Sequence, residues 1–173
     1  APGDIRNVIC ALANVDDDLK QLFQYRFEGE HHIKGHALGN LLLAATHEIT
    51  SDFHEAVAKI AKLFNVQANI FPIVNESVTL HAKLEDGSTV SGESKIPLKN
   101  QKIEEVMITP ENVRANQAVI DAIIEADMVV ISPGSLYTII LPNLIISDVI
   151  EAMQETSAQI VYVCNIMTQP GET

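Results

Sequence analysis

The sequence predicts an α/β fold with a mainly parallel sheet and a small antiparallel β-hairpin excursion. The last third of the chain reads as helix, apolar strand, helix and apolar strand, over residues 112–126, 128–131, a helix to about 155, and 159–164. Successive units of this kind build parallel sheets through crossover helices. The middle of the chain alternates apolar and polar residues around a tight turn, which predicts the hairpin.

Helices are predicted first along the chain, from apolar residues at helical spacing over 5–12, 19–27, 36–46 and 53–64. Asp4 is a candidate N-cap of the first helix, and Ser51 with Asp52 caps the fourth. The acidic residues 16–18 favour the start of the second helix, because negative charge stabilises a helix N-terminus. The third helix is strongly apolar, so we expect it to be largely buried.

The middle of the chain changes to strand patterns. Residues 68–74 read as a strand interrupted by Pro72, and residues 103–108 read as another strand. Between them, residues 78–84 and 89–92 flank a tight turn in which Gly87 suits a positive φ. We therefore expect a hairpin insertion near 75–105 within one domain that spans 1–173.

The most informative stretch is 129–138, where an apolar β-branched run ends in a Pro-Gly-Ser turn before a helical pattern. A strand–loop–helix corner presents backbone N–H groups and a helix N-terminus to an anion. Gly134 removes a side chain that would block close approach, and Ser135, Tyr137 and Thr138 offer hydroxyls. An ordinary connection between a strand and a helix explains the same pattern, so both interpretations are open.

The loops that follow the two apolar strands are expected to meet. The strand 128–131 is fully apolar, as in strands buried in parallel sheets. Ligands of open α/β sheets bind outside the carboxyl ends of such strands. Ser132, Gly134 and Ser135 are therefore expected beside Asn165 and Thr168.

Composition restricts the classes of function. The chain has 173 residues, of which 47% are apolar, and this suits a compact domain with a sizeable core. A formal net charge of −12 argues against a nucleic acid or an anionic membrane as the main partner. No apolar run is long enough to span a bilayer, and a cytoplasmic protein is expected. Cys10 and Cys164 lie in apolar runs and are expected to be buried packing residues.

No metal site is predicted from the protein's own side chains. Several histidines lack the spacing of metal ligands, and these are His31, His32, His47 and His54. The order of serine, histidine and aspartate residues along the chain supports no catalytic triad either.

Six motifs occur in order along the chain, at residues 3–7 (GDIRN), 22–27 (LFQYRF), 35–41 (GHALGNL), 92–94 (GES), 133–138 (PGSLYT) and 165–173 (NIMTQPGET). Together they closely resemble the bacterial gluconeogenesis-factor family, part of the CofD-like superfamily of 2-phospho-L-lactate transferases. Members of that family are nearly twice as long. The chain is thus expected to be a fragment that lacks an N-terminal Gly-rich strand-loop, an acidic segment after it, and a C-terminal extension. Ser132 departs from the family pattern, which usually has glycine there.

The resemblance implies a Rossmann-like three-layer α/β/α fold and a cytoplasmic regulator. Such a regulator is required for cell shape and wall synthesis on gluconeogenic carbon sources, and it binds a nucleotide-sugar of the UDP-N-acetylglucosamine type. Arginine forks match phosphate geometry, and asparagine amides suit the edges of a sugar or base. The candidate ligand-binding residues are Arg6, Asn7, His36, Asn40, Ser132, Gly134, Ser135, Tyr137, Thr138, Asn165 and Thr168.

Several of these residues have competing structural interpretations. Arg6 and Arg26 could pair with acidic residues at the surface, such as Asp16, Asp17 or Glu28. His36 could simply begin a helix. Gly35 and Gly39 could serve close packing.

The alternative function is a transferase that moves a phospho-acid group from a nucleotide donor to an acceptor hydroxyl. That reaction needs a divalent cation and a well-placed carboxylate, and the family's carboxylates lie in the missing N-terminal segment. No cofactor is assigned, and Mg²⁺ with a bound nucleotide is left open, as are a homo-oligomer and contacts with cell-wall synthesis proteins. Catalytic residues stay unassigned.

Overall fold

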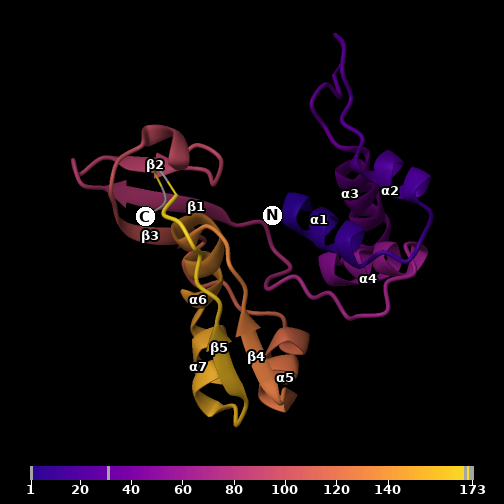
Figure 1. Cartoon of the computed structure of the whole chain (residues 1–173). Helices are drawn as coiled ribbons and strands as arrows, with labels where there is room; N and C mark the ends of the chain where they lie inside the picture. Colours follow the sequence, from indigo (N-terminus) through magenta and orange to yellow (C-terminus); the bar gives the residue numbers. More distant parts are fainter. Residues whose placement is uncertain (1, 31, 170, 172–173) are drawn as a thin grey trace. The chain divides into compact units, whose positions relative to one another are not determined.

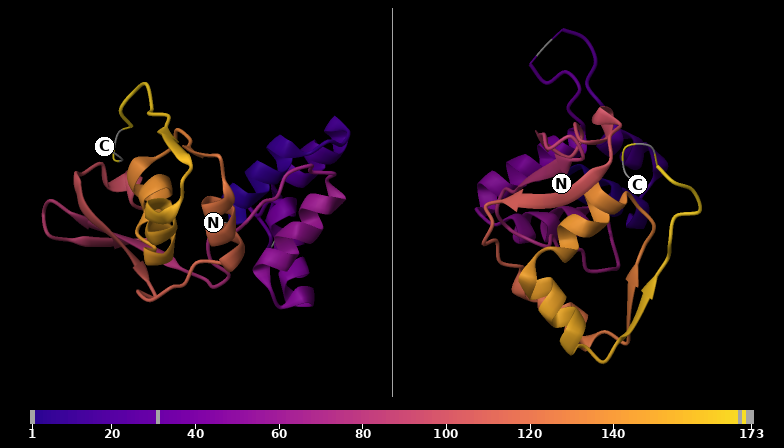
Figure 2. Two further views of the ribbon diagram at one scale, coloured as in Figure 1. Left: turned by 90° about the horizontal axis from the view of Figure 1, so that it is seen from below. Right: turned by 90° about the vertical axis from the view of Figure 1, so that its left-hand side faces the viewer.

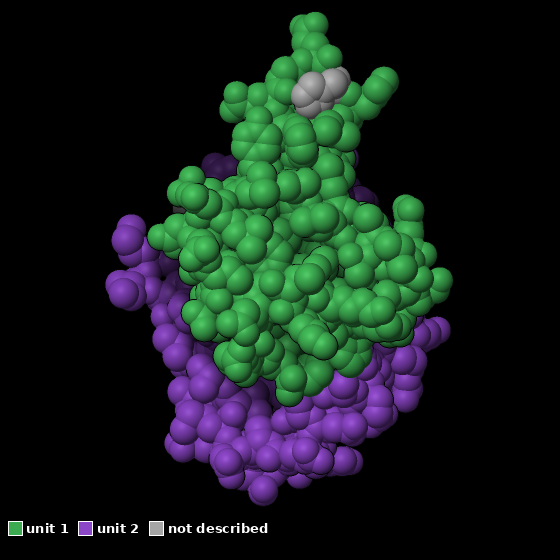
Figure 3. Space-filling view, turned by 90° about the vertical axis from the view of Figure 1, so that its right-hand side faces the viewer, with its two compact units in different colours: residues 1–75 green, residues 76–173 purple. Residues whose placement is uncertain are grey.

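The structure, a computed structural model, describes residues 2–30, 32–169 and 171. The chain forms two compact units, residues 1–75 and residues 76–173, which are coloured separately in Figure 3. Its helices and strands follow the order shown in Figure 1, and this confirms the predicted α/β class. The single domain predicted for residues 1–173 stays a prediction.

The described part of the first unit is helical, with α1 (Pro2–Leu12), α2 (Asp17–Gln24), α3 (Leu38–Thr50) and α4 (Phe53–Leu63). The predicted cap of α4 is confirmed, because the Asp52 side chain accepts a hydrogen bond from the Glu55 N–H at 2.8 Å. Asp4 does not cap α1, because the helix begins before it and Asp4 lies in the first turn.

The core of this unit forms around two aromatic rings. Phe23 of α2 and Phe64 after α4 lie with their ring centroids 4.2 Å apart. Both are buried, with aliphatic neighbours from α1, α3 and α4. A Cβ at Gly39 would lie 2.7 Å from the Phe23 ring and 2.7 Å from its backbone oxygen. Gly39 is therefore needed for the close approach of α3 to α2.

The third helix is less buried than expected. Leu43 is fully buried, but Leu42 is 39% exposed and Ile49 is 82% exposed. An apolar helix on the surface of a single layer buries only the stripe that faces its neighbours. The prediction of a largely buried helix is therefore wrong for this structure.

Residues 25–30 and 32–37 form an arm between α2 and α3, and the helices predicted over 19–27 and 36–46 extend into its two ends. Arg26 pairs with Ala37 in an isolated antiparallel bridge, and the Phe27 N–H donates to the His36 oxygen at 3.0 Å. Gly29 and Gly35 both have positive φ, which lets the chain reverse between the paired segments. Consequently α2 ends before Phe27, and His36 precedes α3.

Residues 68–74 form no strand, contrary to the sequence-based expectation. Pro72 lies in the middle of this segment and has no N–H to donate to a strand ladder. The apolar run is nevertheless partly buried, because Ile70 packs against the core of the first unit.

The second unit begins with the predicted hairpin. Strands β1 (Thr79–Leu84), β2 (Thr89–Ser91) and β3 (Ile103–Thr109) form an antiparallel sheet in the order β2-β1-β3. Gly87 has a φ of 81° in the turn, as predicted. A hydrogen bond from Ser88 lowers the pKa of the Asp86 carboxyl there. A short 3₁₀ helix, η1 (Pro97–Lys99), follows β2.

The rest of the unit contains the parallel pair. Strand β4 (Met128–Ile131) pairs with β5 (Gln159–Tyr162), and α5 (Gln117–Glu125) and α7 (Ser147–Glu155) contact each other beside them (Figures 1 and 2). The predicted bounds of β4 are confirmed. Helix α5 starts later than predicted because Asn116 caps it, accepting the Ala118 N–H at 3.1 Å.

The helix predicted to run from the loop to about residue 155 is interrupted. It consists of a π-helix, η2 (Leu136–Ile140), then α6 (Leu141–Leu144), then α7. Pro142 cannot donate to the carbonyl four residues earlier, and its ring crowds that turn. The chain widens instead, and the N–H groups of Ile139 and Ile140 both donate to the Ser135 oxygen, at 3.0 and 2.9 Å.

The strand β4 is not buried on both sides, contrary to expectation. Met128 is 52% exposed and Val130 is 54% exposed, as are Ile160 and Tyr162 of β5 at 44% and 49%. The alternate residues of β4 are partly buried. In the described unit, one face of the parallel pair is therefore packed and the other is open.

We predict that Gly39→Ala lowers the free energy of unfolding by about 1–3 kcal/mol, because its methyl group would overlap Phe23. Urea unfolding measures the change. Gly3→Ala is the matched control, since a Cβ at Gly3 has nothing within 4 Å. Equal stability of the two variants would show that α2 and α3 can separate without cost.

Candidate functional site

The carboxyl ends of β4 and β5 bring two loops together. In this parallel pair Ile131 lies opposite Tyr162, so the chain leaves both strands at the same end. The Gly134 N–H donates to Asn165 Oδ1 at 3.0 Å, and Asn165 Nδ2 donates to the Gly134 oxygen at 2.8 Å. The expected proximity of Gly134 and Asn165 is therefore present, as a reciprocal pair of hydrogen bonds.

This pair changes the roles that the two residues can have. The Asn165 amide uses its oxygen and its nitrogen on Gly134, so it braces the loop. The Gly134 N–H is likewise occupied while the pair is intact. Leu136 and Tyr137 lie at the start of η2, where a helical first turn leaves N–H groups without intrahelical partners. Sequence reasoning placed these residues together but did not identify the brace.

Gly134 itself is under little steric constraint. A Cβ there would meet only Ile139 and Ile140 side-chain carbons, at 3.8 and 3.9 Å, which is ordinary van der Waals contact. Its φ is not positive. The fold therefore tolerates alanine at this position, and any stricter need for glycine would come from a ligand.

The hydroxyls of the loop differ in access. Ser132 is exposed, and Ser135 and Tyr137 are half-buried. Thr138 of η2 is only 7% exposed, so its side chain is buried. Thr168, in the loop after β5, is exposed. Three of the four predicted hydroxyls of 132–138 are therefore at least partly accessible.

Tyr162, the last residue of β5, adds a group that the sequence did not indicate. Desolvation raises the pKa of its phenol, and electrostatic and hydrogen-bond interactions with Cys164 raise it further. Cys164 is exposed, which corrects the expectation that it is buried, whereas Cys10 is buried and accepts a hydrogen bond from Gln24 at 2.8 Å.

The first unit holds a second group of predicted residues. Arg6 of α1 donates from Nη2 to Asn7 Oδ1 at 2.8 Å and from Nη1 to Asn40 Oδ1 at 3.3 Å. Arg6 is only 7% exposed, so the surface ion pair considered for it is absent from the described residues. The structure thus brings Arg6, Asn7 and Asn40 together.

His36 and Arg26 belong to the arm and not to this group. Arg26 donates to the Gly35 oxygen at 2.8 Å, and His36 Nδ1 lies 3.2 Å from the Ile33 oxygen. Both side chains are exposed, and both contacts hold the arm's own turn. The candidate residues therefore fall into one group per unit, with His36 in neither.

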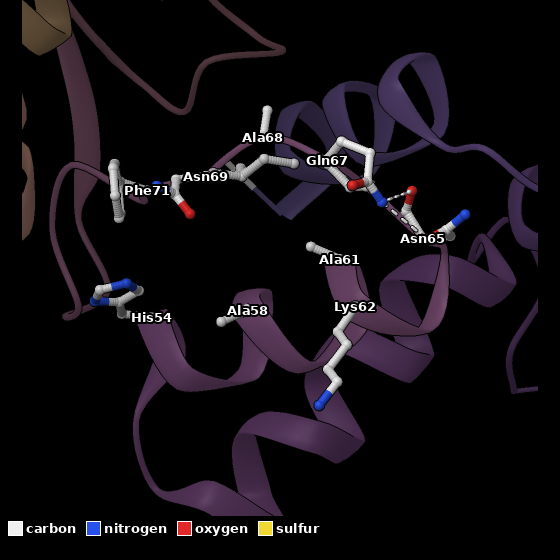
Figure 4. A pocket seen from close by; sticks show the side chains of 11 residues that line it. His54, Ala58, Ala61, Lys62, Asn65, Gln67, Ala68, Asn69 and Phe71 are labelled. Carbon is white, nitrogen blue, oxygen red and sulfur yellow. Dashed lines mark hydrogen bonds between the residues drawn. The ribbon is translucent and has the colours of Figure 1, made fainter.

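A groove lies elsewhere in the first unit, between α4 and the segment 65–71 (Figure 4). It has a volume of about 310 Å³ and contains none of the residues predicted to bind a ligand. His54 and Phe71 form one end, with ring centroids 5.4 Å apart, and Ala58 and Ala61 form the floor. The polar side chains of Lys62, Asn65, Gln67 and Asn69 that line it are exposed, so the groove offers no buried polar group that would select a ligand.

In the part of the chain that the structure describes, no group of three His, Cys, Asp or Glu side chains is arranged to hold a metal ion. None of the described helices is by itself long and apolar enough to cross a membrane. Of the motif 165–173, Pro170, Glu172 and Thr173 lie outside the described residues.

Comparison with known proteins gives matches along the whole chain. Residues 1–173 match the family described as 2-phospho-L-lactate transferase CofD. A gluconeogenesis factor of Bacillus subtilis is 51% identical over 99% of this chain and 54% of its own length. Another, from Halalkalibacterium halodurans, is 47% identical over 99% of this chain and 53% of its own. The chain thus spans about half the length of the curated relatives it matches.

Solved structures agree with this similarity. A crystal structure of a Bacillus halodurans protein matches 99% of this chain and 55% of its own, with a TM-score of 0.95 and 47% identity. A second crystal structure, of a UPF0052 family member from the same organism, matches with a TM-score of 0.94.

We predict that Asn165→Ala speeds hydrogen exchange of the Gly134 amide, because it removes that N–H's acceptor. Leaving both groups of Gly134 without partners should also cost about 1–3 kcal/mol of stability. Asn165→Asp keeps an acceptor and should retain the protection. Asn143→Ala, which removes a bond to the Ile139 oxygen in the adjacent helix, is the matched control. Unchanged Gly134 protection in Asn165→Ala would contradict the brace.

Proposed function

Because this chain belongs to the 2-phospho-L-lactate transferase CofD family and its curated relatives are gluconeogenesis factors, we propose that it is a regulator that binds a nucleotide-sugar. The ligand is of the UDP-N-acetylglucosamine type. Its binding controls cell shape and wall synthesis during growth on gluconeogenic carbon sources, in the cytoplasm. Homo-oligomers and contacts with cell-wall synthesis proteins are part of this proposal.

The observation that carries the proposal is the corner at 132–138. It joins the carboxyl end of a parallel strand to the N-terminus of η2, and Asn165 holds its turn in place. Backbone N–H groups at a helix start favour a phosphate by hydrogen bonding and by the peptide dipoles. Because a brace fixes the loop before the ligand arrives, less conformational entropy is lost on binding.

The side-chain chemistry of this corner supports binding without turnover. Segments 132–138 and 165–169 contain no Asp, Glu, His, Lys or Arg. Oriented backbone N–H groups can hold a diphosphate through their local dipoles, although the protein as a whole has a net charge of −12. Proton transfer to or from a substrate ordinarily needs an ionisable group with a pKa near neutrality.

The alternative is a transferase, and the family description favours it. That chemistry requires a divalent cation held by carboxylates near the donor phosphates. The described residues at this corner do not supply such a set, and no group of three potential ligands occurs elsewhere among them. Catalysis by this part of the chain would therefore depend on carboxylates from another segment.

The test of the proposal is calorimetric titration of the intact protein with UDP-N-acetylglucosamine, with GDP and Mg²⁺ as the comparison. We expect saturable binding of the UDP-sugar and no consumption of it over hours. Gly134→Val should weaken this binding while the thermal midpoint stays nearly unchanged, because the position has room for a Cβ. Gly134→Ala is the graded control, with a smaller loss.

Two outcomes would contradict this assignment. Equal loss of binding and of stability in Gly134→Val would make the glycine structural. Preference for the guanine nucleotide, or slow turnover in the presence of an acceptor, would favour the transferase.

Tyr137 provides a second, independent prediction. Its half-buried ring lies in the first turn of η2, where it can stack on or hydrogen-bond a ligand. Tyr137→Ala should weaken UDP-sugar binding by about 1–3 kcal/mol, and Tyr137→Phe separates the hydroxyl from the ring. Unchanged affinity in Tyr137→Ala would remove this residue from the site.

A further inference from the structure

Arg6 is a buried cation whose charge the described residues do not neutralise. Buried arginines are rare unless they are paired, because desolvation of an unpaired guanidinium is costly. Arg6 is 7% exposed, and no carboxylate among the described residues lies within ion-pair distance of it. Its Nη groups donate to the neutral amide oxygens of Asn7 and Asn40, and its Nε is buried without a partner among the described residues.

The guanidinium lies at the N-terminus of α3. Asn40, which accepts from Arg6 Nη1, is the third residue of that helix. A helix N-terminus carries a positive partial charge, which an acceptor side chain at the cap or an acid in the first turn usually offsets. Here the cap residue is Ala37, with no side-chain hydrogen bond, and the first turn contains no acid.

Two positive features therefore meet at Asn40 without an anion between them. A 13-residue helix and a guanidinium each favour negative charge at this position, and their mutual repulsion falls when an anion binds. The protein as a whole has a net charge of −12, so this is a local departure from its overall field. The missing component has the chemistry of a small oxyanion.

We propose that Arg6 and the first turn of α3 form a binding site for a phosphoryl group. The planar fork of a guanidinium matches the spacing of two phosphate oxygens. Asn7 is exposed and Asn40 is half-buried, so their amides form the accessible edge of the site. This inference concerns the first unit and does not depend on loop 132–138.

The first test is thermal unfolding of the intact protein with increasing inorganic phosphate, at ionic strength matched with chloride. A ligand that binds only the folded state raises the midpoint in a saturable way. We expect this response in the wild-type protein. In Arg6→Met, which keeps the length of the side chain and removes its charge, phosphate affinity should fall by at least about tenfold.

A second variant keeps the test decisive if Arg6→Met folds poorly. Asn40→Asp places a carboxylate in the first turn of α3, within reach of Arg6 Nη1, and so supplies the anion internally. It should raise the thermal midpoint without phosphate and abolish the phosphate response. Asn112→Asp adds the same charge at an exposed position of the other unit and should change neither.

Because loop 132–138 is also proposed to hold phosphate, Gly134→Val is measured in parallel. A phosphate response that survives in Gly134→Val and disappears in Asn40→Asp supports the Arg6 site. A response lost only in Gly134→Val, a response equal in all variants, or no saturable response in the wild-type protein overturns it. Failure of UDP-sugar binding with an intact Arg6 response would overturn the proposed function alone.

A comparison of ligands identifies the source of the phosphoryl group. Uridine monophosphate and inorganic phosphate are titrated at equal concentrations into Gly134→Val protein. Tighter binding of the nucleotide indicates the phosphate of a larger ligand, and equal binding indicates the free ion. Either result supports the site only if Asn40→Asp abolishes the binding.

Discussion

The parallel pairing of β4 with β5 is the constraint on which the loop 132–138 depends. Met128 lies opposite Gln159 and Ile131 opposite Tyr162, so both strands end together. Only this register brings the Asn165 amide to the Gly134 peptide, because a slip of one residue would turn the side chains to the opposite face. The reciprocal bonds then fix the peptide before Ser135, and the start of η2 follows from it.

Pro142 imposes the second constraint on this corner. The apolar residues of the stretch 136–155 have the spacing of one continuous helix, but Pro142 lies within it. The missing N–H produces a π turn instead, in which the Ser135 oxygen accepts two N–H groups. Thr138 is buried within that turn, and Ser135 and Tyr137 stay partly accessible. The division of the loop's hydroxyls into inner and outer groups thus follows from one residue outside the loop.

What the sequence predicted, and what it missed, separates local from nonlocal causes. The Asp52 cap, the Gly87 turn and the bounds of β4 depend on neighbours a few residues away, and all three are confirmed. The helices predicted over 19–27 and 36–46 are shorter in the structure because the two sides of the arm pair with each other, and helical spacing does not report such pairing. Gly39 was open to two interpretations until the position of Phe23 showed that a Cβ has no room. Pro142 indicates a break in the helix, whereas the apolar periodicity on both sides of it predicts a continuous helix, and the structure has the break.

In the two proposed sites, the candidate residues would hold negative charge by different physical means. At 132–138 the donors are neutral peptide N–H groups and hydroxyls, whose attraction for an anion is short-ranged and depends on geometry. At Arg6 the attraction comes from a full charge whose hydration has been removed by burial, so the free protein pays a desolvation cost that a bound anion offsets. Segments 132–138 and 165–169 contain no Asp, Glu, His, Lys or Arg, and Asn7 and Asn40 are neutral amides. The proposed binding of a ligand needs only fixed donors of this kind, whereas the alternative transferase needs carboxylates that hold a divalent cation, and these would have to come from another segment.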